Sequence, residues 1–275
     1  MAINLHEKYS AKVADKFYTE SVILGKTSRE YEFDGYKSIK VTTFTTVAPG
    51  NYTRSGATRY GELTDVQDTI QTMTISQDKA VTLAVDKGDN KQSQMIRNAG
   101  KIANLEVREQ FVPMFDKYAL DAWAKHTGVL SKAHASLTKS NIVEAIGDGI
   151  TAMMNEGVAL TNVYCYIGAT NYSKLVNAPE FLNLEKLGAK AVAKGVVGEV
   201  RGVQIVPVPD AYLPSGVNFM LVKKECVLAP TQIKDLKLHT DPMGVSGAVL
   251  EIRWLFDAFV LDAKKAGVFK STTAA

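Results

Sequence analysis

The chain has 275 residues and a hydrophobic content of 46%, and its 32 Lys and Arg residues nearly balance its 29 Asp and Glu residues. These values describe an ordinary globular protein with one large domain or two modest ones, and the charge balance argues against a strongly nucleic-acid-binding protein. No apolar run reaches the roughly 20 residues that a spanning helix needs, and charges interrupt the N-terminus where a signal peptide would be apolar. We therefore expect a chain that is made in a cytoplasm and has no membrane partner.

Residues 1–30 are predicted to form an arm that contains a short helix. Tyr9, Val13, Phe17 and Tyr18 recur at roughly helical spacing in a stretch that is otherwise polar. A helix this short is unstable alone, so its apolar side must pack on the same chain or on a neighbouring one. We therefore expect Tyr9, Phe17 and Tyr18 to make the contacts of the arm.

Residues 31–90 are predicted to form an extended β-hairpin. Residues 39–47 have the pattern of one strand, and apolar residues of a single parity indicate a second strand within 72–85. The span between them contains Pro49 and three glycines, which is typical of a mobile tip. A long, half-apolar hairpin is hard to stabilise alone, so we expect it to lie against a partner. The residues of the tip that we expect to contact that partner are Arg54, Arg59, Tyr60, Glu62 and Asp65.

Residues 93–127 are predicted to form one long helix, roughly 50 Å in length. Ser93 is the expected N-cap, Gly128 the expected end, and Pro113 is expected to bend the helix. Large aromatic residues on this helix and on a later strand have two possible roles, in the core or as anchors of an interface. They are Phe111, Tyr118, Trp123 and Trp254.

The rest of the chain is predicted to form a mixed α/β body. Residues 138–157 have the pattern of a second amphipathic helix that ends at Gly157, residues 163–169 of a buried strand, and residues 171–183 of a short helix. From residue 196 onward, strands and turns dominate. We found no internal repeat or linker, so an α+β body with two excursions, the arm and the hairpin, is favoured over two independent domains.

Two short motifs partly match known sites for a nucleotide or a nucleophile. Gly25, Lys26 and Thr27 match the end of a phosphate-binding loop, but Glu20 occupies the position where that loop needs a glycine. Residues 244–248 contain a serine between glycines, but not at the spacing of a nucleophile elbow. We interpret this second motif as a turn between two strands.

Metal-binding and acid–base patterns are equally weak. His126 and His134 are eight residues apart, whereas metal-binding helices place their ligands three or four apart, so both are expected to face solvent or lie in turns. Asp257 and Asp262 flank apolar strand residues and are expected to form surface or interface ion pairs. The sequence thus predicts no cofactor, no metal site and no catalytic residue, and the chain is not expected to be an enzyme.

The two cysteines, Cys165 and Cys226, each lie in an apolar, strand-like run. Buried, reduced thiols are the favoured interpretation, because such cysteines act as small hydrophobic residues. A disulfide between them is the alternative, which a reducing cytoplasm disfavours.

The order and lengths of these parts resemble those of a tailed-bacteriophage major capsid protein of the Hong Kong ninety-seven type, a fold shared with encapsulin nanocompartments. Nearly the whole chain takes part in the resemblance, including GVVGEVRGVQIVPVPDAYLPSG at 195–216 and LEIRWLFDAFVLDAKKAGVFK at 250–270. The resemblance implies an N-terminal arm at 1–30, an extended loop at 31–90, a peripheral domain with its spine helix at 91–139, an axial domain at 140–228, and a return to the peripheral domain at 229–275.

The resemblance also implies a function and partners. The chain would assemble with itself, as hexamers and pentamers, into the icosahedral shell of a virion in the cytoplasm of a host bacterium. A separate scaffolding protein, a portal protein and packaged double-stranded DNA, held by weak contacts with the inner wall, would be its partners. Crosslinking between subunits is not implied, because Lys37 and Lys40 lie at the base of the loop. Two alternatives are an encapsulin-like shell with protein cargo and an α/β enzyme with an unrecognised site.

Overall fold

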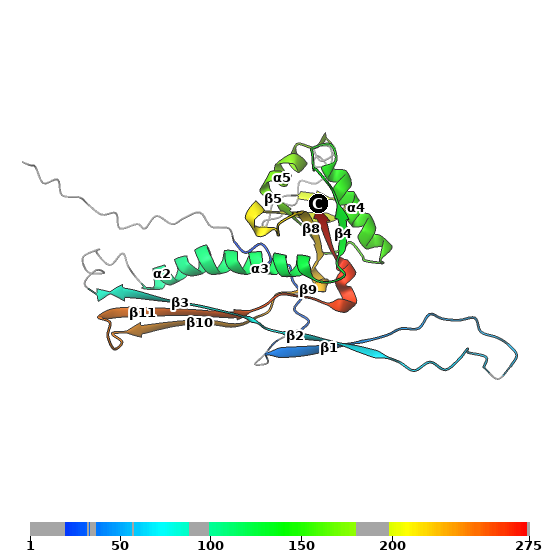
Figure 1. Cartoon of the computed structure of the whole chain (residues 1–275), viewed down its shortest axis with the longest axis horizontal. Helices are drawn as coiled ribbons and strands as arrows, with labels where there is room; N and C mark the ends of the chain where they lie inside the picture. Colours follow the sequence, from blue (N-terminus) through cyan, green and yellow to red (C-terminus); the bar gives the residue numbers. More distant parts are fainter. Residues whose placement is uncertain are drawn as a thin grey trace, which may run out of the picture.

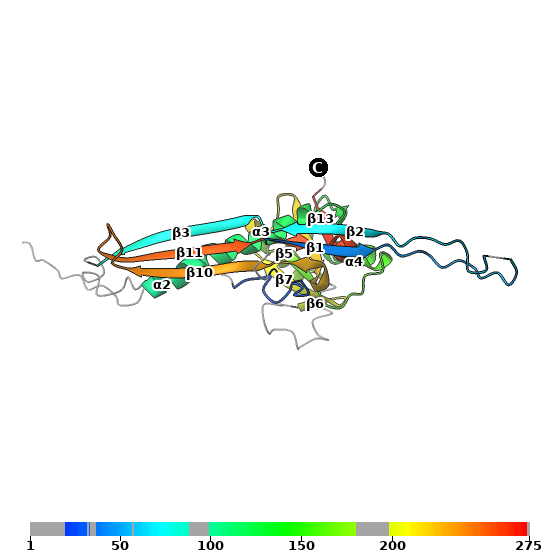
Figure 2. The ribbon, with the colours of Figure 1, turned by 90° about the horizontal axis from the view of Figure 1, so that it is seen from below.

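The computed structural model describes residues 20–31, 33, 37–56, 58–87, 99–179 and 198–273. The predicted arm residues Tyr9, Phe17 and Tyr18 and the predicted cap Ser93 lie outside these ranges. The described chain mixes helices and strands, as the α+β class predicts. A three-stranded sheet extends from a central body towards one end of the molecule, and a two-stranded hairpin extends towards the other (Figure 1, Figure 2).

The hairpin consists of β1 (Ser38–Phe44) and β2 (Asp68–Thr74), which pair antiparallel with Ile39 opposite Met73. The prediction of a single second strand within 72–85 is wrong. The strand ends at Thr74, and β3 (Gln77–Asp86) leaves the hairpin to pair with β11 (Gly247–Phe256). In both β2 and β3 the less exposed residues are the odd-numbered ones. The alternation of inward and outward side chains therefore continues from one strand to the next, although the partner strand changes.

The long helix is present as α2 (Ala99–Glu106), a π-helical turn (Val107–Phe111) and α3 (Val112–Lys125), in one rod along the three-stranded sheet (Figure 1). Pro113 lies at the start of α3, directly after the π-helical turn, where a missing N–H is least costly. The sheet has the order β10 (Thr231–Thr240), β11 and β3. Alternate residues of β11 from Leu250 to Phe256 are buried, so one face of this sheet is apolar.

The central body is a six-stranded sheet. Its order is β4 (Leu130–Ala133), β13 (Val268–Thr272), β8 (Val217–Lys223), β5 (Val163–Gly168), β7 (Val203–Val208) and β6 (Gly198–Val200). Strand β13, in the range predicted to return to the peripheral part, pairs on one side with β4 of the predicted peripheral range 91–139 and on the other with β8 of the predicted axial range 140–228. The apolar pattern of this strand indicates burial but not a partner.

Two helices and several short elements complete the described chain. The helices are α4 (Ile142–Asn155) and α5 (Ala169–Val176), which correspond to the two predicted helices, although α5 begins two residues earlier than predicted and ends at Val176. The short elements are the pair β9 (Val227–Leu228) and β12 (Phe259–Val260) and the 3-10 turns Asp210–Tyr212, Lys224–Cys226 and Asp262–Gly267. The motif at 244–248 ends the turn between β10 and β11 and begins β11 at Gly247, so the predicted turn between two strands is present.

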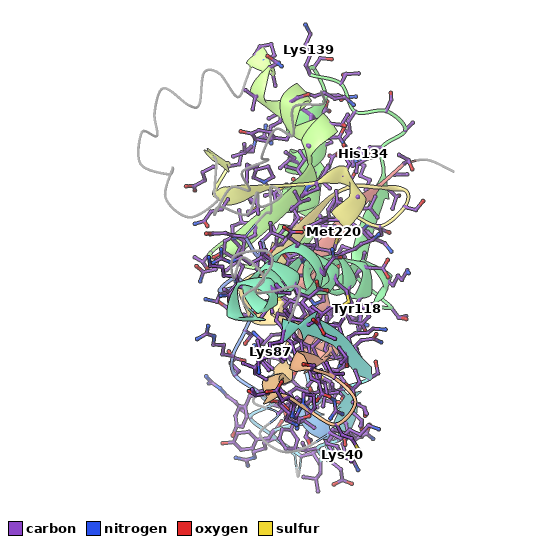
Figure 3. The ribbon with its side chains drawn as sticks, turned by 90° about the vertical axis from the view of Figure 1, so that its left-hand side faces the viewer. Lys40, Lys87, Tyr118, His134, Lys139 and Met220 are labelled. Atoms are coloured by element: carbon purple, nitrogen blue, oxygen red, sulfur yellow. The ribbon has the colours of Figure 1, made fainter. Side chains whose placement is uncertain are left out.

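Helix α3 lies between two layers of strands. Viewed along the long axis, Met220 of the six-stranded sheet lies above Tyr118 of α3, and Lys87 and Lys40 lie below it (Figure 3). The largest apolar cluster accordingly joins residues of α3 with residues of both sheets. A second cluster joins α4 to the six-stranded sheet, and a third lies at the base of the hairpin. Among the described helices, none has the length and apolar character needed to cross a membrane.

Both cysteines are buried and free, which confirms the favoured interpretation. Burial raises the pKa of the Cys226 thiol to about 11 and raises that of Cys165 still further. Neither thiol is therefore a nucleophile at neutral pH.

Candidate functional site

The hairpin and the loop at its tip form the most exposed part of the described chain. Arg54, Arg59, Tyr60, Glu62 and Asp65 are all exposed, as expected for residues that contact a partner. All four charged side chains are exposed to solvent, and the Nε–H of Arg59 donates a hydrogen bond of 3.4 Å to the carbonyl of Gly56. Within the loop, the ring of Tyr60 packs edge-on against Tyr52 at a centroid distance of 5.1 Å.

The same segment exposes apolar side chains. Seven of the twelve large hydrophobic residues that the described chain exposes lie between residues 44 and 70: Phe44, Val47, Tyr52, Tyr60, Leu63, Val66 and Ile70. Phe44 lies opposite Asp68 and Ile70 lies opposite Thr42, so Phe44 and Ile70 are diagonal neighbours on one face of the hairpin. A cluster of exposed apolar residues of this kind indicates a surface that contacts another molecule.

The strands of the hairpin also have unpaired edges. In the described chain, β1 and β2 pair only with each other, so the outer edge of each presents free N–H and C=O groups. An isolated two-stranded hairpin is only marginally stable in water. The hairpin therefore has both apolar side chains and backbone groups that a partner would satisfy.

The base of the hairpin, in contrast, is held firmly on the body. Met73 and Ile75 are almost fully buried, in a cluster with Leu228 and Leu261. The amide of Gln71 donates a 2.8 Å hydrogen bond to the carbonyl of Val260 and accepts one of 2.9 Å from the backbone N–H of Asp262. A fixed base directs the hairpin away from the body, so its far end is presented outward.

A buried carboxylate lies where the hairpin passes into β3. Asp257 is 4% exposed and accepts hydrogen bonds from the backbone and hydroxyl of Ser76, both at 2.8 Å, and from the hydroxyl of Tyr118 at 2.8 Å. Burial and the nearby carboxylate raise the pKa of Tyr118 to about 12. The prediction that Asp257 forms a surface ion pair is therefore wrong, whereas Asp262 lies at the surface, 3.2 Å from His126.

The predicted aromatic residues lie in the core of the chain itself. Trp123 is fully buried, and Phe111 and Trp254 are 4% and 7% exposed, with ring centroids 5.3 Å apart. The indole N–H of Trp123 points at the carbonyl of Leu228, at 3.4 Å. These three residues therefore fix α3 between the two sheets, and Tyr118 positions the hairpin base through Asp257.

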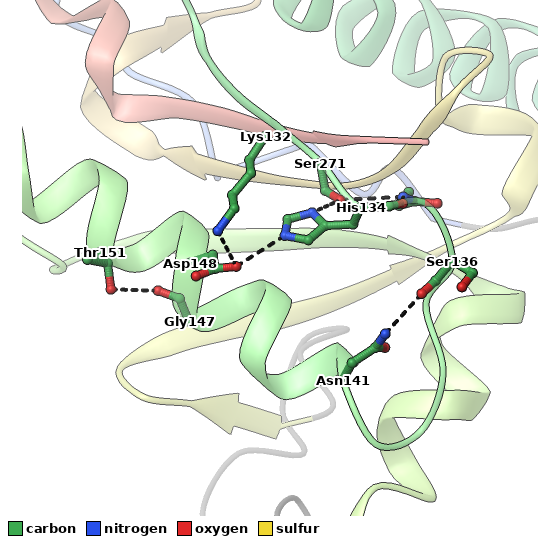
Figure 4. Close-up of polar contacts among 9 residues, drawn as sticks. Lys132, His134, Ser136, Asn141, Gly147, Asp148, Thr151 and Ser271 are labelled. Carbon is green, nitrogen blue, oxygen red and sulfur yellow. Dashed lines mark hydrogen bonds and ion pairs between the residues drawn. The ribbon is translucent and has the colours of Figure 1, made fainter. Parts of the chain in front are cut away.

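One polar cluster has the residue types of a serine hydrolase (Figure 4). His134 contacts Ser271 Oγ at 2.9 Å through Nδ1 and Asp148 Oδ2 at 3.3 Å through Nε2. Lys132 Nζ lies 2.7 Å from the same carboxylate oxygen, and its hydrogen bond is the main reason that the pKa of Asp148 is lowered. Ser271 is completely buried in β13, so no substrate can reach its hydroxyl.

This cluster instead fastens the edge of the six-stranded sheet. The backbone N–H of His134 donates a 2.7 Å hydrogen bond to the carbonyl of Thr272, and the amide of Asn218 donates to the carbonyl of His134. The sequence predicts that His134 faces solvent or lies in a turn. It lies in the loop that directly follows β4, but its side chain is only 13% exposed, so the solvent-facing alternative is wrong. Its side chain is held because β4, β8, β13 and α4 meet at this point, which the sequence does not reveal.

No other feature of the described residues offers a catalytic centre. A cleft of about 410 Å³ lies between residues 24–33 and 228–232, and among the described residues of its lining Arg29 is the single charged one. One cation cannot supply the acid and base that most enzymatic hydrolyses need. Within the described residues there is also no group of three or more side chains that could hold a metal ion.

Comparisons with known proteins identify the fold. No protein-family model matches the sequence, and no curated protein matches it. A structure from Mycobacterium phage Che8 superposes with a TM-score of 0.75 over 99% of each chain at 15% identity. The capsid structure of cyanophage P-SCSP1u gives a TM-score of 0.78 over 98% of this chain and 93% of that chain at 14% identity.

A virus-like particle from Pyrococcus furiosus is less similar, with a TM-score of 0.55 over 86% of each chain at 10% identity. The similarity to the phage structures extends over nearly the full length of both chains, so it includes the hairpin, the helical rod and both sheets. The chain has the fold of tailed-phage capsid proteins.

Proposed function

We propose that this chain is a major capsid protein that assembles with copies of itself into the closed shell of a tailed-phage virion. The hairpin carries the proposal, because it exposes apolar side chains and two free strand edges while its base is fixed on the body. A closed shell needs each subunit to bind several neighbours through repeated contacts. A hairpin that extends from the body, with exposed apolar side chains and unpaired strand edges, can form such contacts with a neighbouring subunit.

The proposed domains follow the fold. Residues 38–74 are the core of the extended loop, the helical rod with the three-stranded sheet is the peripheral domain, and the six-stranded sheet with α4 and α5 is the axial domain. The N-terminal arm at 1–30 stays part of the proposal. The division at residue 229 changes, because β13 at Val268–Thr272 belongs to the six-stranded sheet.

The proposed partners are other copies of the chain, arranged as hexamers and pentamers. A scaffolding protein and a portal protein would act during assembly in the host cytoplasm, and double-stranded DNA would fill the shell. The near balance of charge supports weak contacts between the inner wall and the DNA. The proposed role is structural and not enzymatic.

The experiment that tests the proposal is assembly of the purified chain, followed by size-exclusion chromatography and negative-stain microscopy, with and without a scaffold. Wild-type protein is expected to form closed shells or rings of subunits. Deletion of residues 50–61 is expected to leave a folded monomer that forms no stable shells. Shells of normal size and yield from this deletion would contradict the role of the hairpin.

Point substitutions in the hairpin test its contacts without shortening it as the deletion of residues 50–61 does. Replacing both Phe44 and Ile70 by serine removes apolar surface from the exposed face and should preserve the fold while reducing the yield of shells. Met154→Ser is the matched control, because Met154 is 57% exposed on α4, outside the hairpin. Equal yields from the double variant and the control would count against hairpin-mediated assembly.

An encapsulin-like shell is the second candidate, and the similarity to the Pyrococcus furiosus particle is the observation that favours it. The two candidates differ in what the shell encloses. Particles purified from the natural source and treated with nuclease outside should release protected DNA if the chain is a phage capsid protein. Particles that contain an enzyme and no DNA would favour the second candidate.

A further inference from the structure

A second buried carboxylate joins the start of the described chain to the long helix. Asp116 of α3 is completely buried. Its Oδ1 accepts a hydrogen bond of 2.7 Å from the hydroxyl of Ser21, and its Oδ2 accepts one of 2.8 Å from the backbone N–H of Val22. These contacts cross more than ninety positions of sequence, so Asp116 is a specific attachment point for residues 20–28.

The segment folds around this carboxylate as a compact turn. The backbone N–H of Leu24 donates to the hydroxyl of Ser21 at 3.2 Å, and Lys26 Nζ donates to the carbonyl of Val22 at 2.8 Å. Val22 and Ile23 are buried in the same apolar cluster as α3. Residues 20–28 therefore cover the carboxylate of Asp116, and the carboxylate would be exposed to water if these residues detached from α3.

Two ionisable side chains act on Asp116 from the elements around it. Lys26, on the segment, attracts the carboxylate charge, although burial lowers the pKa of Lys26 itself. Tyr166, on β5, is fully buried, and its pKa is raised first by burial and then by the charges of Asp116 and Tyr164. Among the described residues, Lys26 is the one cation that acts on Asp116, and its attraction does not offset the cost of placing an anion in the core.

We infer that Asp116 is a proton-controlled anchor that holds residues 20–28 on helix α3 more tightly in acid than in alkaline solution. Both protonation states fit the geometry. The ionised group accepts from Ser21 and from Val22, as described above. The protonated group can donate its O–H to Ser21 Oγ while its other oxygen still accepts from Val22, so protonation removes the buried charge and keeps the attachment.

The direction follows from linkage. Burial, against smaller opposing effects of Ser21, Val22 and Lys26, raises the pKa of Asp116 from 3.8 to about 6. A group with a raised pKa contributes stability that is fully present below its ordinary value of 3.8 and is lost as the pH rises through about 6. If release of the segment returns Asp116 to water, the equilibrium constant for attachment should fall about tenfold between pH 5 and pH 8.

The anchor is a property of the chain, whether or not the chain forms shells. A consequence for assembly rests on the proposed function: residues 20–28 directly follow the first part of the predicted arm, so a looser anchor would free the base of that arm. A failure to form shells would therefore leave the anchor standing, and a failure of the anchor would leave the proposed shell function standing.

Hydrogen exchange read by mass spectrometry tests the anchor on the full chain. Protection of the peptide that contains Val22, corrected for the intrinsic pH dependence of exchange, is measured from pH 5 to pH 8. Wild type is expected to lose about tenfold in protection across this range. Asp116→Asn keeps a neutral group of the same shape, so its protection is expected to be constant.

Two further variants complete the design. Asp121→Asn removes one carboxylate from a more exposed position of the same helix, where Asp121 pairs with Lys125, so it should keep the wild-type dependence on pH. Ser21→Ala removes a hydrogen bond that lowers the pKa of Asp116, so the midpoint of the transition should move to higher pH. This variant and the wild-type profile decide the question even if Asp116→Asn does not fold.

Three results would overturn the inference. They are a wild-type protection that is constant or rises towards pH 8, an Asp116→Asn variant with the wild-type slope, and a midpoint that does not move in Ser21→Ala.

Discussion

The hydroxyl of Tyr118 on α3 lies 2.8 Å from the carboxylate of Asp257, which directly follows β11. The other oxygen of Asp257 holds Ser76, at the point where β2 of the hairpin gives way to β3. The helix, the three-stranded sheet and the hairpin are thus joined through one buried carboxylate. The direction of the hairpin depends on this junction, because the backbone of Ser76 is fixed there.

Tyr118→Phe should reduce the free energy of unfolding by about 1–2 kcal/mol, because a buried carboxylate loses one of its hydrogen bonds. Urea denaturation measures the change, and hydrogen exchange at residues 74–77 should increase. Tyr60→Phe is the matched control, since the same oxygen is removed from a side chain that is 93% exposed. Equal stability of the two variants would show that the junction contributes nothing.

Trp123→Ala should reduce the free energy of unfolding by about 3–5 kcal/mol, because it leaves a cavity between α3 and its neighbours. Phe44→Ala removes a ring that is 67% exposed and should change the stability of the isolated chain by less than about 0.5 kcal/mol. Thermal and urea unfolding of unassembled protein distinguish the two. A mild effect of Trp123→Ala would contradict the close packing of Trp123 between α3 and its neighbours.

His134→Ala should cost about 1–3 kcal/mol of unfolding free energy, because the buried hydroxyl of Ser271 loses its 2.9 Å partner. His239→Ala provides the comparison: His239 also contacts a carboxylate, that of Glu251, but both side chains are about half exposed. Its loss should cost less than about 1 kcal/mol. The prediction fails if the two histidine variants unfold at the same urea concentration.

Two glycines of α4 should respond in opposite directions to the same substitution. A Cβ at Gly149 would lie 2.7 Å from Leu221 and 2.8 Å from Phe269 in a packed core, so Gly149→Ala should destabilise by about 1–3 kcal/mol. A Cβ at Gly147 would meet the flexible end of Arg201, which can move aside. Gly147→Ala should therefore be neutral or gain up to about 1 kcal/mol from helix propensity.

Circular dichroism during thermal unfolding would measure this pair of alanine variants in one experiment. Because helix propensity is the same for both, the difference in melting temperature reports only what surrounds each Cβ. A Gly149→Ala variant at least as stable as wild type would mean that α4 does not pack closely on the six-stranded sheet.

Periodicity made the helices and most strands predictable. The apolar stripe from Ile142 to Met153 and the stop at Gly157 correspond to α4, which ends at Asn155. The long helix was also predicted, although the π-helical turn before Pro113 was not. These elements are local: the side chains that define the pattern are three or four positions apart, so they report their own burial.

The sequence also contains a weaker indication of the buried acids Asp116 and Asp257. Asp116 shares the helix face of Ala119, Leu120 and Trp123, so an acid occupies a core position of an otherwise apolar stripe. Asp257 similarly interrupts an apolar run at the end of β11. An acid at a core position predicts a hydrogen-bonded partner from elsewhere, but neither Ser21 nor Tyr118 can be identified without the fold.

From the sequence alone one obtains the class of the chain, its helices, the loop between the two strands of the hairpin, and the lack of a recognisable catalytic motif, because these depend on composition and on short-range periodicity. Tertiary structure alone decided that β3 pairs with β11 and β13 with β8, that Asp116 and Asp257 are buried, and that the half-buried His134 contacts Ser271 and Asp148. The reason is physical. The sequence of a strand shows which of its faces is buried. Its backbone can form the same hydrogen bonds with any partner strand, so the choice of neighbour depends on the packing of the whole chain.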